Sequence, residues 1–128
     1  MNTKHIQWGA IAMALAVLFG AFGAHALKEM VTAAKVAIFE TGVCYQFYHA
    51  IGLMVAGLAA EYAQVGRLAW AVRLFLLGIL LFSGSLYLLT FTEQISLPLA
   101  IVGPLTPIGG LCFVAGWVML ALAMTTSK

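Results

Sequence analysis

Four long stretches of the chain carry almost no charged residue, and they limit what it can fold into. They cover about residues 6–27, 43–60, 68–91 and 99–124. A helix needs about 20 mostly apolar residues to cross the hydrocarbon layer of a bilayer, which is about 30 Å thick. We therefore expect four transmembrane helices joined by short connections, with residues 1–128 forming a single transmembrane domain.

The composition supports a membrane protein. Of the 128 residues, 64% are hydrophobic and 8% are charged, whereas soluble domains carry about a quarter charged residues. So few charges cannot give a fold of this size a polar surface in water. The sequence predicts an all-α membrane protein, an antiparallel bundle of four transmembrane helices. A net charge of +2 without a basic run excludes nucleic-acid binding.

The segment after the first stretch, about 27–39, has an amphipathic pattern. Leu27, Ala34 and Ile38 fall on one side of a helix, and Lys28 and Lys35 fall elsewhere. This pattern favours a short helix lying in the membrane interface. A simple loop with incidental apolar residues is the alternative.

The first stretch also has features of a secretory signal, because Lys4 precedes it and an A-x-A pattern ends it at residues 24–26. Its apolar run is longer than the usual 7–15 residues, which favours a permanent helix. Small residues follow one another at intervals of four: Ala12, Ala16, Gly20 and Ala24. Such a face lets another helix approach closely.

The distribution of Lys and Arg predicts the orientation. Four lie on the side of the two termini and the second loop, namely Lys4, Arg67, Arg73 and Lys128, whereas Lys28 and Lys35 lie on the other side. Cytoplasmic loops carry the excess of basic residues. We expect a multi-pass protein with both termini in the cytoplasm.

Polar residues gather on the opposite side, because the first and third loops of a four-span chain must share one membrane face. The candidate polar or binding cluster there is His25, Glu40, Tyr45, Gln46, His49, Tyr87 and Thr106. If the protein has a binding site, we expect it to open toward these two loops.

His49 is the most informative member, because it lies about two turns inside the second helix. An ionisable side chain at that depth must be neutral and hydrogen-bonded. Gln46, His25, Tyr87 and Thr106 are its expected partners. A hydrogen bond that joins two helices is the simplest role; binding a ligand or handling a proton is the alternative. No carboxylate or thiolate lies at metal-ligand spacing from the histidines, so neither a metal nor a cofactor is expected.

Glu40 precedes the second stretch, where a carboxylate stabilises a helix N-terminus. A proton relay from Glu40 to His49 is the less favoured alternative, since nine residues span about 13 Å of helix.

Two segments with small residues or proline are expected to pack helices together. Residues 83–85 are Ser83, Gly84 and Ser85, and residues 103–110 include Pro107, Gly109 and Gly110. Serine hydroxyls in lipid bond to the preceding turn or to a neighbouring helix. The prolines predict a kink or a non-helical start of the fourth helix, which would form a wall of any pocket near His49.

No catalytic motif with a defined mechanism occurs in the sequence, so an enzyme is not expected. The favoured function is a structural or accessory component of the membrane or of a membrane complex. Its expected partners are membrane lipid and either further copies of the chain or other membrane proteins. The alternative is a module that binds or transports a lipid, a small hydrophobic molecule or a proton.

Several segments together resemble a known family. They are residues 20–27 (GAFGAHAL), 45–50 (YQFYHA), 81–87 (LFSGSLY), 106–110 (TPIGG) and Gly116-Trp117. The chain resembles the YgdD family of small bacterial inner-membrane proteins, which has eukaryotic relatives. The resemblance implies four transmembrane helices and an inner-membrane location. It brings no substrate, cofactor or catalytic residue.

Overall fold

A computed structural model describes residues 1–125, and within them the chain forms helices and no strands. The elements in chain order are α1 (Thr3–Ala24), η1 (Ala26–Glu29), α2 (Ala33–Leu58), η2 (Ala59–Glu61), α3 (Val65–Gly78), η3 (Ile79–Ser83), α4 (Gly84–Thr90) and α5 (Leu99–Ala123). Of these, η1 and η2 are 3₁₀ turns and η3 is a π-helical turn that joins α3 to α4.

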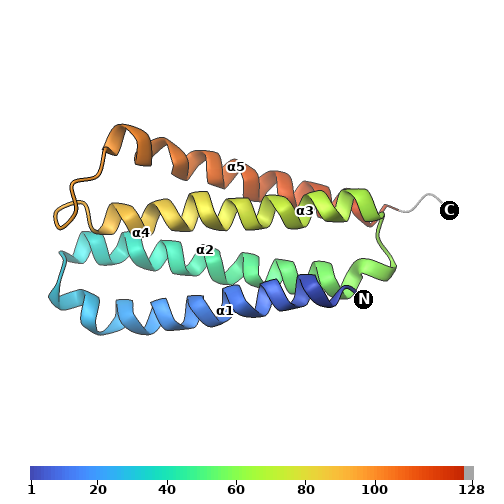
Figure 1. The fold of residues 1–128 in the computed structure, drawn as a ribbon, viewed down its shortest axis with the longest axis horizontal. Helices are drawn as coiled ribbons and strands as arrows, with labels where there is room; N and C mark the ends of the chain where they lie inside the picture. Colours follow the sequence, from blue (N-terminus) through green and yellow to red (C-terminus); the bar gives the residue numbers. More distant parts are fainter. Residues whose placement is uncertain (126–128) are drawn as a thin grey trace.

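Four continuous helical stretches of this described part are long and apolar enough to cross a membrane: Thr3–Glu29, Ala33–Glu61, Val65–Thr90 and Leu99–Ala123. They run antiparallel, so that both termini lie at one end of the bundle and the first and third loops lie at the other (Figure 1). The expected fold class is confirmed. We call these ends the termini side and the loop side.

Backbone hydrogen bonds and helix caps fix the termini side. The Asn2 side chain accepts from the backbone N–H groups of Lys4 and His5 at the start of α1. The Asn2 backbone N–H donates to the Gly57 carbonyl at 2.8 Å. The Gln64 N–H donates to the Ala123 carbonyl, also at 2.8 Å. Each contact joins two chain segments, so the start of α1 is held to α2 and the start of α3 to α5.

The segment expected as an interfacial helix, 27–39, is divided between η1 and the first turns of α2. Thr32 caps a new helix by accepting from the Lys35 N–H, and α2 then runs without a break from Ala33. The apolar residues of this segment, Val36 and Phe39, are buried against the bundle. Of the predicted apolar face, Leu27 is buried, Ile38 is partly buried and Ala34 is exposed, so the buried face of this segment differs from the predicted one.

For the fourth helix, the prolines predicted either a kink or a non-helical start. The non-helical start is absent, because Leu99–Ala123 is α-helical throughout. Pro98 stands just before its first residue, where a missing backbone donor costs nothing. Pro104 and Pro107 lie inside the helix but on its exposed side. Their rings therefore displace no neighbouring helix.

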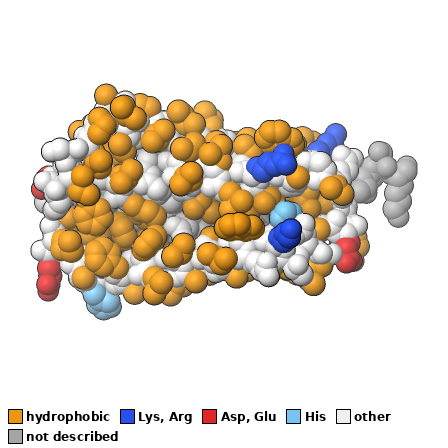
Figure 2. All heavy atoms as spheres, viewed as in Figure 1, with side chains coloured by type: hydrophobic (Ala, Val, Ile, Leu, Met, Phe, Trp, Pro, Cys, Tyr) orange, Lys and Arg blue, Asp and Glu red, His pale blue; other side chains and the backbone are white. Residues whose placement is uncertain are grey.

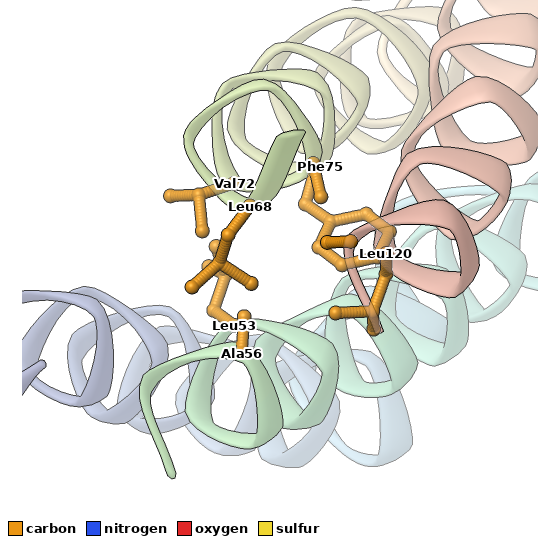
Figure 3. Close-up of a cluster of buried hydrophobic side chains, with 8 residues drawn as sticks. Leu53, Ala56, Leu68, Val72, Phe75 and Leu120 are labelled. Atoms are coloured by element: carbon orange, nitrogen blue, oxygen red, sulfur yellow. The ribbon is translucent and has the colours of Figure 1, made fainter. Parts of the chain in front are cut away.

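Two hydrophobic cores hold the bundle together. The termini-side core joins α2, α3 and α5 and contains Leu53, Ala56, Leu68, Ala71, Val72, Phe75, Leu120 and Ala123. Figure 3 shows the labelled side chains of this core converging from the three helices. The loop-side cluster contains Leu27, Val36 and Phe39, with Phe19, Phe22, Val31, Val43, Tyr87 and Phe91 packed against it.

Glycines allow α1 to lie directly on α2. A Cβ atom at Gly9 would lie 2.7 Å from the Ala50 carbonyl oxygen, and one at Gly57 would lie 2.8 Å from the Asn2 carbonyl oxygen. Real Cβ atoms do not approach backbone oxygens so closely, so larger residues would separate the two helices. Close backbone packing of this kind stabilises helix pairs in lipid.

Candidate functional site

His49 lies on α2 and is held by two hydrogen bonds. Its Nδ1 lies 2.6 Å from the Tyr45 carbonyl oxygen, one turn earlier, and its Nε2 lies 3.0 Å from Trp117 Nε1 on α5. A carbonyl oxygen can only accept and an indole N–H can only donate. The imidazole must therefore be neutral with its proton on Nδ1, and both ring nitrogens are occupied.

Aromatic rings surround the same imidazole. The Phe113 ring stacks on it, with centroids 3.4 Å apart and planes 10° apart, and the Phe75 ring lies 5.6 Å away. Gly52 leaves the space that Trp117 fills, since a Cβ there would lie 3.2 Å from the indole ring. His49 thus joins α2, α3 and α5 through packing and hydrogen bonds at once.

Gln46 makes a second connection, one turn earlier on α2. Its Nε2 donates to the Ala12 carbonyl of α1 at 2.8 Å, and its Oε1 accepts from the Tyr87 hydroxyl of α4 at 2.7 Å. The side chain is buried. One amide therefore holds three helices together. The two bonds use one of its two N–H donors and one of the two lone pairs of its carbonyl oxygen.

The hydroxyls of the 83–85 segment make a third set of contacts beside the π-helical turn. Ser83 donates to the Gly42 carbonyl of α2 at 2.7 Å. Ser85 donates to the Phe82 carbonyl at 2.9 Å, and its Oγ lies 2.6 Å from Thr106 Oγ1. Since Ser85 has one proton, Thr106 is the donor to Ser85.

The candidate polar residues therefore do not form one cluster. Gln46 pairs with Tyr87, His49 with Trp117, and Thr106 with Ser85. His25 is exposed at the loop side. Glu40 is also exposed, but it lies inside α2 and not at the helix N-terminus as predicted, because Thr32 caps the helix and α2 begins at Ala33. Tyr45 is exposed and packs on the Phe82 ring, with 4.6 Å between centroids. None of the four partners expected for His49 contacts its ring nitrogens by a hydrogen bond.

Trp117 is the partner that the sequence reasoning missed. A signal was present, because a tryptophan inside a spanning helix needs an acceptor for its N–H. Phe113 and Trp117 are also four residues apart, on one face of α5. This face meets His49, whereas the 103–110 segment meets the π-helical turn.

The expected packing residues differ in their contacts. Of the small residues on α1, Ala16 is buried, Ala12 and Gly20 are partly buried, and Ala24 is exposed. Gly109 is buried directly against Phe82, while Gly84 and Gly110 are partly buried and Pro107 is exposed. The α1 stripe thus contacts α2 along most, though not all, of its length.

The two loops on the loop side are also tied together. Lys35 Nζ donates to the Leu89 carbonyl at 2.9 Å and to Thr92 Oγ1 at 2.7 Å. Gln94 Nε2 donates to the Met30 carbonyl at 3.1 Å. These bonds fix α2 against the end of α4, and they place the first and third loops side by side as expected for an even number of spans.

Comparison with known proteins identifies the family. A family described as "Protein of unknown function (DUF423)" matches residues 19–110. The UPF0382 membrane protein YwdK of Bacillus subtilis is 43% identical, over 90% of each chain. A UPF0382 membrane protein of Haemophilus influenzae is 35% identical, over 100% of this chain and 98% of its own. No solved structure matches.

The chain belongs to the DUF423 family. The DUF423 match includes Gln46, His49, Tyr87 and Thr106 but ends before Phe113 and Trp117. The UPF0382 relatives are named membrane proteins, which agrees with the four apolar helices of this DUF423 protein. Among residues 1–125, no group of three His, Cys, Asp or Glu side chains is arranged to hold a metal ion.

Proposed function

We propose that this protein is a non-enzymatic accessory component of the bacterial inner membrane, and that it belongs to the YgdD group within its family. One observation carries the proposal: among residues 1–125, every buried side-chain nitrogen or oxygen has a hydrogen-bond partner within the protein. The buried polar groups of this part of the chain bond within the protein, and several of them join helices, which supports a structural role.

His49 illustrates the argument. A general base needs a ring nitrogen within reach of a substrate proton, yet one nitrogen of His49 faces a carbonyl oxygen and the other faces an indole N–H. In a protonated imidazole Nε2 would also carry a proton, so that two N–H donors, that of His49 and that of the Trp117 indole, would face each other. This arrangement favours a structural role over proton transfer.

The charge distribution supports an orientation with both termini in the cytoplasm. Lys4, Arg67 and Arg73 lie toward the termini side, and Lys128 lies outside the described residues. On the face shown in Figure 2, the Lys and Arg side chains lie toward the end that carries the termini, and hydrophobic side chains cover most of the length. Basic residues favour the cytoplasmic side.

The outer helices offer surfaces for partners. Large exposed side chains on α1 are Trp8, Ile11, Leu15 and Leu18, and those on α5 include Leu111, Val114 and Val118. These surfaces contact lipid, further copies of the chain or other membrane proteins. An accessory function requires that at least one of them binds protein.

Photo-crosslinking in the native membrane tests this requirement. A photoreactive residue replaces Leu15 on α1 or Leu111 on α5, and the matched control replaces Tyr62, which is exposed in the second loop. We expect a discrete protein adduct from one of the helix positions and none from the control. Crosslinks to lipid alone, with a lone monomer recovered in every mild detergent, would refute an accessory role.

A second measurement tests the structural role of His49. His49→Ala should lower the melting temperature, while His25→Ala, at an exposed position, should leave it unchanged. An unchanged melting temperature for His49→Ala, combined with failure to complement a deletion strain, would make His49 a functional site and contradict the proposal.

A further inference from the structure

An aromatic cavity lies on the loop side of the bundle, between α1 and α4. It has a volume of about 440 Å³ and is lined by Phe19 and Phe22 of α1, Phe39 of α2, Tyr87 of α4 and Phe91, just after α4. Phe19 and Phe39 both contact the Tyr87 ring, with centroid distances of 5.1 and 4.9 Å. The walls are therefore held in place by one another.

The chemistry of the lining excludes a polar occupant. The Tyr87 hydroxyl donates to Gln46 Oε1 inside the bundle, so the cavity presents ring carbons. A bound water needs two to four polar partners, and none is offered here. Phe19, Phe22, Tyr87 and Phe91 are all partly exposed, so the cavity is open to the surrounding lipid rather than sealed inside the protein.

A hydrocarbon chain fits this cavity better than a helix of another protein. A helix is about 10–12 Å across with its side chains, and the contact between Phe19 and Tyr87 joins the two walls. An extended acyl chain is much thinner. It can lie among the rings without separating α1 from α4.

Charged groups at the loop side of the bundle indicate which kind of lipid carries the chain. A smaller hollow of about 240 Å³ is lined by Lys28, Ala33 and Val36, and Val36 packs in the same buried cluster as Phe39. Lys28 and the adjacent Glu29 are both exposed. Together they complement a headgroup with a phosphate and an amino group.

We propose that the aromatic cavity binds one acyl chain of an aminophospholipid, with the lipid phosphate at Lys28 and its amino group at Glu29. The loop-side position suits this assignment, because an acyl chain inside the bundle then continues to a headgroup at the membrane surface. The site is distinct from the hydrogen bonds of His49, and it does not depend on the accessory function.

Lipid retention by the full-length protein tests the proposal. The protein is reconstituted in nanodiscs that contain equal amounts of phosphatidylethanolamine and phosphatidylglycerol, released into mild detergent and examined by native mass spectrometry. We expect one phosphatidylethanolamine to remain per chain. Phe22→Trp, which fills the cavity, should lower retention at least about tenfold, which corresponds to about 1.4 kcal/mol.

Matched variants separate the cavity from general effects. Phe47→Trp places the same ring at an exposed position of α2 and should retain the lipid. Lys28→Glu should lower retention about fivefold, as expected for one exposed charge pair, while Lys4→Glu at the opposite end should not. Phe91→Trp narrows the cavity from the other wall and replaces Phe22→Trp if that variant fails to fold.

Three results would overturn the proposal. Wild-type protein could retain no lipid in a fixed ratio, or both cavity variants could fold and retain it as well as Phe47→Trp does. Equal retention of the two phospholipids would refute the headgroup assignment at Lys28 and Glu29.

Discussion

On the termini side, α2, α3 and α5 meet mainly through leucine, alanine and valine side chains, whereas on the loop side α1, α2 and α4 meet mainly through aromatic rings. Small residues let helices approach until their backbones are almost in contact, as Gly9 and Gly57 do where α1 lies on α2. Rings keep helices apart and leave a cavity of about 440 Å³. In lipid, where burial of apolar surface gives no drive to associate, packing supplies much of the stability. We infer that the termini side stabilises the fold and that the loop side leaves room for a ligand.

Truncating a phenylalanine on each side should show this difference most strongly. Phe75 is fully buried between α2, α3 and α5, whereas Phe22 is partly exposed beside the cavity. Phe75→Ala should lower the free energy of unfolding by about 3 kcal/mol through the void it leaves. Phe22→Ala should lower the free energy of unfolding by less than about 1 kcal/mol, because this side chain is already partly exposed to lipid. Unfolding in mixed micelles measures both, and equal losses would contradict the division into two kinds of packing.

Gly109→Ala should have the next largest effect, at the junction of the two sides. An added Cβ would lie 2.8 Å from the Phe82 Cα, so α5 must move away from the π-helical turn. Overpacking of this kind costs about 2 kcal/mol. Gly103→Ala is the matched control, because a Cβ there has no atom within 4 Å. The melting temperature of Gly109→Ala should therefore be clearly lower than that of Gly103→Ala. An unchanged melting temperature for Gly109→Ala would show that α5 can shift its position against η3.

The number of helices and their connectivity follow from the sequence because the bilayer sets the length of every span. Apolar runs separated by charged residues leave little choice of topology. The start of α2 could not be placed in the same way, since Val36 and Phe39 are its buried residues, whereas Ala34 on the predicted apolar face is exposed. An amphipathic pattern fits an interfacial helix and the first turns of a spanning helix equally well.

The hydrogen-bond partners of polar side chains inside the bundle could not be predicted from their depth in the membrane alone. Tyr87 and Gln46 were expected on the same side and are bonded, yet His49 bonds to Trp117 instead of to either. The choice depends on how each helix is rotated and on the distance between helices, which close packing decides. The aromatic cavity was missed for the same reason, because its five rings come from three separate segments of the chain.

Trp117→Phe should have a smaller effect than either packing variant. The ring volume largely remains, but His49 Nε2 loses its donor. An interhelical hydrogen bond in a membrane contributes about 1 kcal/mol or somewhat less, and we expect a loss of that size in the free energy of unfolding. Trp70→Phe, at an exposed position of α3, is the control. A loss equal to that of Phe75→Ala would mean that the hydrogen bond, rather than the packing, holds α5 to α2.

Tyr87→Phe should have the smallest effect, and it tests both sides of the comparison at once. The variant removes the donor to Gln46 Oε1 but keeps the ring that lines the cavity. We expect a loss of about 0.6 kcal/mol, the average for hydrogen bonds between membrane helices, with lipid retention unchanged. Tyr62→Phe, on an exposed loop residue without this bond, should change neither quantity. If Tyr87→Phe instead abolished lipid retention while the melting temperature stayed the same, the hydroxyl would have to reach the ligand. The cavity would then bind its ligand through a hydroxyl group, and an acyl chain would no longer be the expected ligand.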